Sequence, residues 1–319
     1  MTDSFVLVRW VFLGLRWLTE NVTSGSIVLT IIIFTVAMRG ITIFGDIKSR
    51  KSSLKMQEIQ PDLQKLQKKY ANNPQKLQQA QSKLMKERGV SMLGGCLPLL
   101  LTMPVFIFFF NAFRTWGYEH MVRLLVELAE TGSSELFGEF RFLWVTNIWQ
   151  PDNGMKPVVM AAESFLAIPN LKNLIYFQEN PAAAEVFTRL GLFVEDVKNI
   201  PAASIVEYNR LVAPITQQYA GYSNGWFVLP VLSGVTMLFS SWLTQKNQPK
   251  ADTGSPGAGT GKMMMWMMPI VSFMFCLTNN AAFAVYWTIS NVVSTLTNLA
   301  LNKKFKKDKE KEERMAPVS

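Results

Sequence analysis

The chain has 319 residues, of which 49% are apolar, with a formal net charge of +9 and a mean hydropathy of +0.15. This composition excludes an ordinary soluble domain and is typical of a polytopic membrane protein. The two cysteines, Cys96 and Cys276, lie in apolar segments, and His120 is the single histidine. These residues are too few for a metal-ligand cluster or a Cys–His nucleophile pair. We therefore expect inert, buried thiols, no metal, no cofactor and no enzymatic activity.

The first 25 residues are expected to form an amphipathic helix on the outer membrane surface. Residues 5–18 are apolar but contain Arg9 and Arg16, which are seven residues apart and so close to one helix face. Fourteen residues with two charges are too short and too polar to cross a bilayer. Trp10 and Trp17 are expected at the depth of the lipid headgroups.

Residues 26–46 are expected to form the first membrane span, and Arg39 lies inside it. An arginine stays charged in the membrane and costs roughly 2.5–3.5 kcal/mol at the centre of a span. Two interpretations follow from this run alone. The side chain extends to the cytoplasmic headgroups, or it serves a function inside the membrane.

Residues 47–90 are expected to form a basic helical hairpin in the cytoplasm. Apolar residues recur at helical spacing along its first helix, at Ile59, Leu63, Leu66 and Tyr70. Asn73 followed by proline is typical of a helix start, and Gly89 of a helix end. The exposed lysines are candidates for recruiting substrates or partners, namely Lys48, Lys55, Lys65, Lys68 and Lys69.

The rest of the chain completes a five-span pattern. Further spans are expected at residues 91–114, 225–245, 263–278 and 281–301. Between the spans we expect an extracytoplasmic region at 115–224 with an insertion at about 153–222, and a cytoplasmic linker at 246–262 with a flexible stretch at 252–261. After them we expect a basic cytoplasmic tail at 302–319 that is disordered over 303–314.

Charge sets the expected orientation. Residues 47–90 hold eleven Lys/Arg and three acids, whereas residues 115–224 hold seven Lys/Arg and twelve acids. The positive-inside rule places the basic segments in the cytoplasm and the acidic one outside. The N-terminus is then outside and the C-terminus is cytoplasmic. The insertion has two interpretations, a cap over the outer face or a docking surface.

Several blocks of sequence resemble one known family. They are residues 55–70, 95–106, 142–145, 229–236 and 263–269, followed by Tyr286-Trp287 and Asn291. In this order, beside an arginine in the first span, they are similar to the YidC/Oxa/Alb membrane protein insertases, in particular the short, Gram-positive-like bacterial type. The resemblance covers essentially the whole expected membrane core.

The resemblance implies a fold and a function. The fold is an all-α polytopic membrane protein, with five helices around a hydrophilic groove. The function is insertion of nascent membrane proteins, alone or with the Sec translocon, without a nucleotide. Independently of the resemblance, the positive charge of the cytoplasmic face suits anionic lipids and the RNA of the ribosome as partners, unless it only sets the topology. We expect the protein to act as a monomer in the bacterial cell membrane.

The resemblance also assigns Arg39 to the groove, where it attracts the acidic or polar segment of a substrate. Thr35 and Tyr286 match family positions, whereas Asn111, Thr236 and Asn291 are candidates because they are polar residues in spans. Each has an alternative role: hydrogen bonding within a helix for Thr35, bonding between helices for the other polar residues, and core packing for Tyr286. The competing function is a small transporter or channel that uses Arg39 as a counter-charge.

Overall fold

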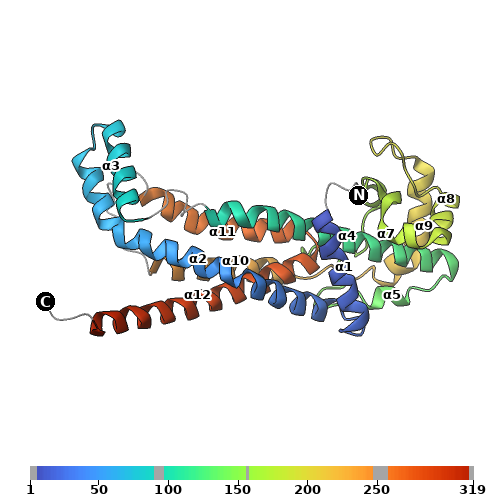
Figure 1. The fold of residues 1–319 in the computed structure, drawn as a ribbon. Coiled ribbons are helices and arrows are strands. Elements are labelled where there is room, and N and C mark those ends of the chain that lie inside the picture. The colour runs from blue at the N-terminus through green and yellow to red at the C-terminus, as the bar shows by residue number, and fades with distance from the viewer. Residues whose placement is uncertain (1–5, 90–96, 156–157, 247–257, 316–319) are drawn as a thin grey trace. The chain divides into compact units, whose positions relative to one another are not determined.

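The computed structural model describes residues 6–89, 97–155, 158–246 and 258–315 (Figure 1). Regular structure in these ranges is helical, apart from an isolated antiparallel bridge between Phe142 and Val145. The expected all-α class is therefore confirmed. The chain divides into two compact units, and α2, α4, α10, α11 and α12 contribute residues to both.

The first unit comprises Met1–Phe34, Phe106–Leu232 and Phe273–Tyr286. Its helices include α1 (Val6–Asn21), the start of α2 (Ile27–Lys69) and the end of α4 (Leu97–Glu130). Five short segments and one longer helix, α9, follow α4: α5 (Glu135–Gly138), α6 (Ala162–Leu166), η3 (Leu171–Asn173), α7 (Ile175–Glu179), α8 (Pro181–Arg189) and α9 (Ala202–Gln218).

Helix α1 is amphipathic, as its sequence predicted. Phe12 and Leu15 are almost completely buried, whereas Trp10 and Trp17 are 68% and 58% exposed. The turn after α1 is fixed to α2 by hydroxyl groups, because Thr30 Oγ1 lies 2.7 Å from Thr23 Oγ1. Because Trp10 and Trp17 are exposed on the other face of α1, their rings are suited to an apolar or interfacial environment.

Aromatic side chains fill the core of the first unit. Phe113 and Phe283 are almost completely buried, and their ring centroids lie 6.2 Å apart. In the segment expected to be an insertion, Tyr208 is fully buried and packs 5.2 Å from the Phe165 ring. Burial raises the pKa of Tyr208, whose hydroxyl donates to the carbonyl of Met160. The segment thus has a packed interior of its own.

Asp152 fixes the chain entry into α10 (Val228–Lys246) within the first unit. Its buried carboxylate accepts hydrogen bonds from the backbone N–H groups of Trp226, Phe227 and Leu229 at 2.7, 2.9 and 2.8 Å. It also accepts one from the indole N–H of Trp144 at 3.1 Å. A carboxylate from elsewhere in the chain thereby caps the helix start.

The second unit comprises Thr35–Val105, Ser233–Ser272 and Trp287–Ser319. It contains the second part of α2, α3 (Pro74–Glu87), and parts of α10, α11 (Ala258–Thr278) and α12 (Ala281–Met315). The flexible stretch expected at 252–261 lies largely outside the described residues, because 247–257 are not described and α11 begins at Ala258.

The C-terminal part of α2 and the whole of α3 form the expected helical hairpin, which Figure 1 shows where the colour changes from blue to cyan. Asn73 caps α3 by accepting from the backbone N–H of Lys76 at 3.0 Å, as its sequence predicted. Ile59 and Leu63 are buried and form a small core, against which Met56, Leu84 and Met85 pack. Helix α2 runs without interruption from Ile27 to Lys69, so one helix joins the expected span to the hairpin.

The expected disorder of the C-terminal tail is wrong, because α12 continues as a helix to Met315. Residues 302–315 contain no glycine or proline and consist largely of good helix formers. Opposite charges four residues apart, such as Lys306 and Glu310, favour the helix further. The mixed charge that suggested disorder is therefore compatible with a helical extension.

One described helix segment, Ile27–Gly45, is long and apolar enough to cross a membrane, with a mean hydropathy of 2.3. Val228–Leu243 and Trp266–Thr278 are shorter apolar helices. The count of five spans stays a prediction. Of the two cysteines, Cys276 is completely buried, as expected, and Cys96 lies outside the described residues.

Candidate functional site

Arg39 is directed at α12 within the second unit. Its Nε donates a hydrogen bond to Ser290 Oγ at 3.0 Å, and a terminal guanidinium nitrogen donates to the same oxygen. Ser290 is 4% exposed, and Arg39 is half-buried. The side chain is thus held by a polar group on a neighbouring helix, which argues against a purely lipid-facing arginine.

The residues beside Ser290 offer unused hydrogen-bonding groups. Thr288 Oγ1 and Asn291 Nδ2 are buried and have no hydrogen-bond partner among the described residues. The backbone carbonyl of Asn291 accepts from Thr295 Oγ1 at 2.7 Å. Buried polar atoms without partners are unfavourable, so such positions usually bind water or a polar ligand. On α12, Thr288 and Asn291 are two positions and one position from Ser290, so their side chains lie on other faces of the helix than the one that holds Arg39.

The other two groove candidates of the second unit make interactions of their own. Thr35, one helical turn before Arg39, is completely buried and is not without a partner. Thr236 is half-buried and donates to the carbonyl of Ser233 in its own helix at 3.1 Å. The structure therefore places Arg39, Thr35, Thr236 and Asn291 in one unit, and gives Thr236 a bond that an ordinary helix threonine also makes.

Asn111 and Tyr286 lie in the first unit. Asn111 Nδ2 donates to the carbonyl of Ile107, four residues earlier in the same helix, at 2.8 Å. Tyr286 is 8% exposed, and its ring centroid lies 5.2 Å from those of both Phe109 and Phe113. Both side chains have local packing or hydrogen-bonding roles, and their contact with a substrate stays a prediction.

A network of hydrogen bonds around two serine hydroxyl groups in the second unit was not predicted from the sequence. Trp287 Nε1 donates to Ser272 Oγ at 2.7 Å, and Ser233 Oγ donates to the carbonyl of Ser272 at 3.2 Å. Ser233 and Ser272 are both buried. Together with Trp287, these two residues connect α10, α11 and α12. The feature of the sequence that could have predicted this network is a small polar residue inside an apolar helix.

The five candidate recruitment lysines all lie on α2 in the second unit, and their side chains are exposed: Lys48, Lys55, Lys65, Lys68 and Lys69. Lys65 lies 3.5 Å from Asp62, and Lys69 lies 5.5 Å from the Tyr70 ring centroid. Exposed pairs of this kind are worth about 1 kcal/mol or less. Such weak contacts, including the one that Lys68 makes, do not prevent the exposed lysines from binding an anionic partner.

The described residues contain no group of three or more His, Cys, Asp and Glu side chains that could hold a metal ion. His120 is enclosed by aromatic rings and stacks on Trp149 with a centroid distance of 4.8 Å. Burial, followed by the nearby Arg123, lowers the pKa of His120 to about 3. A neutral, enclosed imidazole of this kind is a packing element of the first unit.

Comparison with known proteins shows a match to the family model described as 60Kd inner membrane protein, over residues 17–310. Among similar proteins, the membrane protein insertase YidC of Clostridium perfringens is 40% identical over 141 residues, which are 44% of this chain and 52% of that protein. The membrane protein insertase YidC of Chlorobaculum tepidum is 25% identical over 287 residues, which are 90% of this chain and 34% of that protein. The corresponding protein of Aquifex aeolicus is 23% identical over 307 residues, 96% of this chain and 41% of that protein. The chain thus spans about half or less of the length of these relatives.

Proposed function

The chain belongs to the 60Kd inner membrane protein family, the YidC/Oxa/Alb family indicated by its motifs, and we propose that it is a membrane protein insertase. It moves the polar segment of a nascent membrane protein through a hydrophilic groove and releases the apolar helix into lipid. It acts in the bacterial cell membrane without catalysing a covalent reaction. The assignment to the short type rests on the sequence motifs alone.

The observation that supports this proposal best is the hydrogen bonding of Arg39 to Ser290. A guanidinium has five N–H donors in a fixed fork. Ser290 is a single acceptor, so it orients the fork without neutralising its charge. The remaining donors suit a carboxylate or polar backbone group on a substrate.

A polar site in the membrane reduces the main barrier to insertion. Each polar group that enters hydrocarbon without a partner costs several kcal/mol. Arg39 offers such groups hydrogen bonds during transfer. The apolar substrate helix then partitions into lipid. The membrane potential adds roughly 2.3 kcal/mol per charge per 100 mV and favours export of acidic tails.

We further propose that the lysine-bearing part of α2 recruits substrates or partners at the cytoplasmic surface. Its exposed lysines suit anionic lipid, ribosomal RNA or the acidic surface of a partner such as the Sec translocon. A cytoplasmic position of these lysines corresponds to an N-terminus outside the cell and a C-terminus in the cytoplasm, in agreement with the charge pattern.

The test is complementation in bacterial cells depleted of their own insertase. Insertion of two single-span substrates that differ only in an acidic or an uncharged outer tail is measured by protease protection. We expect Arg39→Ala to lower insertion of the acidic-tailed substrate about 10-fold and to affect the uncharged one less. Arg39→Lys should retain part of the activity, because it keeps the charge and loses the fork.

The matched control is Arg210→Ala, since Arg210 is exposed and pairs with Glu207 in the first unit. This variant should insert both substrates at the wild-type level. If Arg39→Ala, expressed at the wild-type level, inserted the acidic-tailed substrate normally, the groove mechanism would be wrong. If the wild-type chain itself failed to restore insertion, the proposed insertase function would be wrong.

A further inference from the structure

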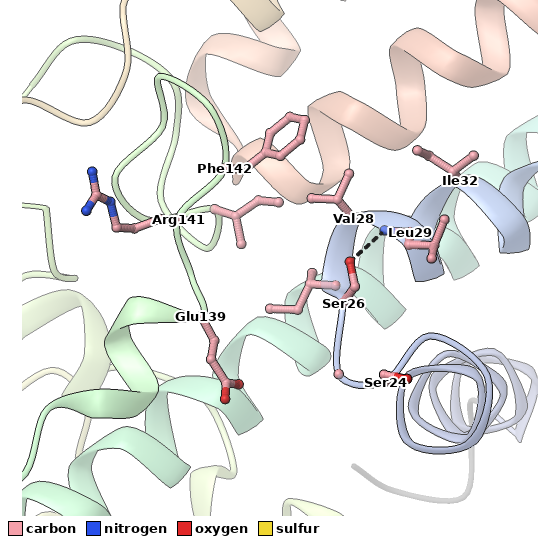
Figure 2. Close-up of a pocket in the computed structure, with 11 residues that line it drawn as sticks. Ser24, Ser26, Val28, Leu29, Ile32, Glu139, Arg141 and Phe142 are labelled. Carbon is pink, nitrogen blue, oxygen red and sulfur yellow. Dashed lines mark hydrogen bonds between the residues drawn. The ribbon is translucent and has the colours of Figure 1, made fainter.

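A pocket of about 550 Å³ lies in the first unit, at the turn between α1 and α2. One wall is formed by residues 24–29 and Ile32, and the other by Glu139, Arg141, Phe142 and Ile148. Figure 2 shows Ser26 at the start of α2, with its hydroxyl accepting from the backbone N–H of Leu29, and Phe142 across from Val28. Two segments far apart in the sequence thus enclose one space.

The depth of this pocket follows from the hydropathy of α2. The apolar segment long enough to cross a membrane begins at Ile27, which is itself a lining residue. If this segment spans the membrane as the sequence predicts, the pocket lies at one end of the span, where headgroups meet acyl chains. Exposed aromatic residues of the same unit are consistent with this depth, since Trp17 is 58% and Trp226 71% exposed.

The pocket has an apolar part and a charged part. Leu29 and Ile32 are 44% and 38% exposed and lie three residues apart, hence on one face of α2. At the opposite rim, Glu139 and Arg141 are exposed, and Figure 2 shows both side chains extending away from α2. Within the described part of the chain, no hydrogen bond or ion pair engages either charged group. A basic and an acidic group thus lie on the far side of the pocket from the apolar surface of Leu29 and Ile32.

We infer that this pocket binds one phospholipid with an amine-bearing, zwitterionic headgroup, such as phosphatidylethanolamine. Arg141 pairs with the phosphate, Glu139 accepts hydrogen bonds from the ammonium group, and an acyl chain lies along Leu29 and Ile32. The charge pattern complements such a headgroup, because a guanidinium suits phosphate and a carboxylate suits a primary ammonium. The apolar wall favours a lipid over a soluble phosphate compound, since it continues directly into the span.

This inference goes beyond the insertase function, because it concerns the end of α2 that lies away from Arg39 and the lysines. The neighbouring turn supports a surface position. Leu143, which directly follows the lining residue Phe142, is 73% exposed and has a φ of 52°. An exposed leucine held at the tip of a turn between Phe142 and Val145 is suited to contact with lipid.

The experiment uses the full chain in nanodiscs of phosphatidylethanolamine and phosphatidylglycerol. One preparation contains phosphatidylethanolamine with a photoactivatable group near the headgroup, and the other contains the matching phosphatidylglycerol. Labelled peptides are mapped by mass spectrometry. We expect labelling by the ethanolamine lipid to concentrate in residues 24–32 and 139–148. Arg141→Gln should lower this labelling at least three-fold, and Glu139→Gln should shift the preference towards phosphatidylglycerol.

The matched controls are Arg189→Gln and Glu185→Gln, which change exposed residues of α8 that do not line the pocket. Labelling is normalised to folded protein, measured by tryptophan fluorescence. Equal labelling in wild type and both pocket variants would overturn the inference, as would equally dense labelling of the exposed face of α10. Competition by soluble glycerophosphoethanolamine would assign the site to a free phosphate compound. Crosslinking of these residues to a nascent substrate in place of the lipid would likewise overturn it.

Discussion

The guanidinium of Arg39 donates two hydrogen bonds to the hydroxyl oxygen of Ser290, a residue 251 positions further along the chain. This contact joins α2 to α12 inside the second unit. It sets the direction of the one charge in the apolar segment Ile27–Gly45. Ser290 is therefore a positioning residue for Arg39 under the proposed function.

Ser290→Ala should reduce insertion of an acidic-tailed substrate by about 10-fold, because loss of a hydrogen bond to a charged group costs about 1.4 kcal/mol or more. Ser290→Thr keeps the hydroxyl and should restore most of the activity. Ser294→Ala, one helical turn away, is the control. Protease protection of the substrate measures all three. Equal insertion by the alanine and threonine variants would contradict a positioning role.

Asp152→Asn should destabilise the first unit by about 2–4 kcal/mol. The carboxylate accepts four hydrogen bonds from N–H donors, and an amide would present its own N–H to some of them. Hydrogen exchange of residues 226–229 should increase, and the thermal midpoint should fall. Asp308→Asn in the exposed tail is the control and should leave both unchanged.

A second change at the same place gives an independent check. The φ of Gly225 is 78°, and a Cβ at this position would overlap Asp152 Oδ1. Gly225→Ala should therefore also destabilise the start of α10, by strain and by displacement of the carboxylate. Normal exchange at residues 226–229 in both variants would show that the cap does not stabilise this entry.

The stability of the first unit should fall on mild acidification because of His120. Its pKa is about 3 in the folded protein and about 6.5 in the unfolded chain, so the unfolded chain binds more protons between these values. The contribution of neutral His120 to the free energy of unfolding is complete above pH 6.5 and is lost as the pH falls towards 3. At pH 5.5 the loss is on the order of 1 kcal/mol.

Thermal unfolding in detergent between pH 7.5 and 5.5 tests this prediction, with His120→Phe as the comparison, because phenylalanine keeps the stacking on Trp149. Glu119 affects the pH dependence of stability in the opposite direction, because burial raises its pKa above the ordinary value despite the nearby Arg123. Its contribution favours stability at lower pH and is centred nearer the ordinary carboxyl range. Identical pH slopes for wild type and His120→Phe would contradict the role given to His120.

Leu63→Ala should open the hairpin locally. Leu63 is 6% exposed and shares its small core with Ile59, and removing a buried leucine side chain costs about 2–5 kcal/mol. At 2 kcal/mol, amide exchange in α3 should become roughly 30-fold faster. Leu77→Ala, at a half-buried position of α3 outside this core, should have a smaller effect. Unchanged exchange in the Leu63 variant would show that other contacts hold α3.

Local patterns predicted much of the secondary structure. The spacing of Ile59 and Leu63 predicted their burial on one helix face, and Asn73 caps α3 as expected. These features depend on residues within one or two helical turns, so the sequence contains them directly. The tail was predicted wrongly, because its mixed charges were taken as a sign of disorder although its residues favour a helix.

By itself, the sequence determined the all-helical class, the family and the presence of a charged residue in an apolar helix. Only the tertiary structure decided which group holds Arg39 and that Asp152 caps α10. The physical reason is that a hydrogen bond between distant segments depends on how each helix is rotated and packed. Periodicity gives the face on which a residue lies, but it does not give the partner that faces it.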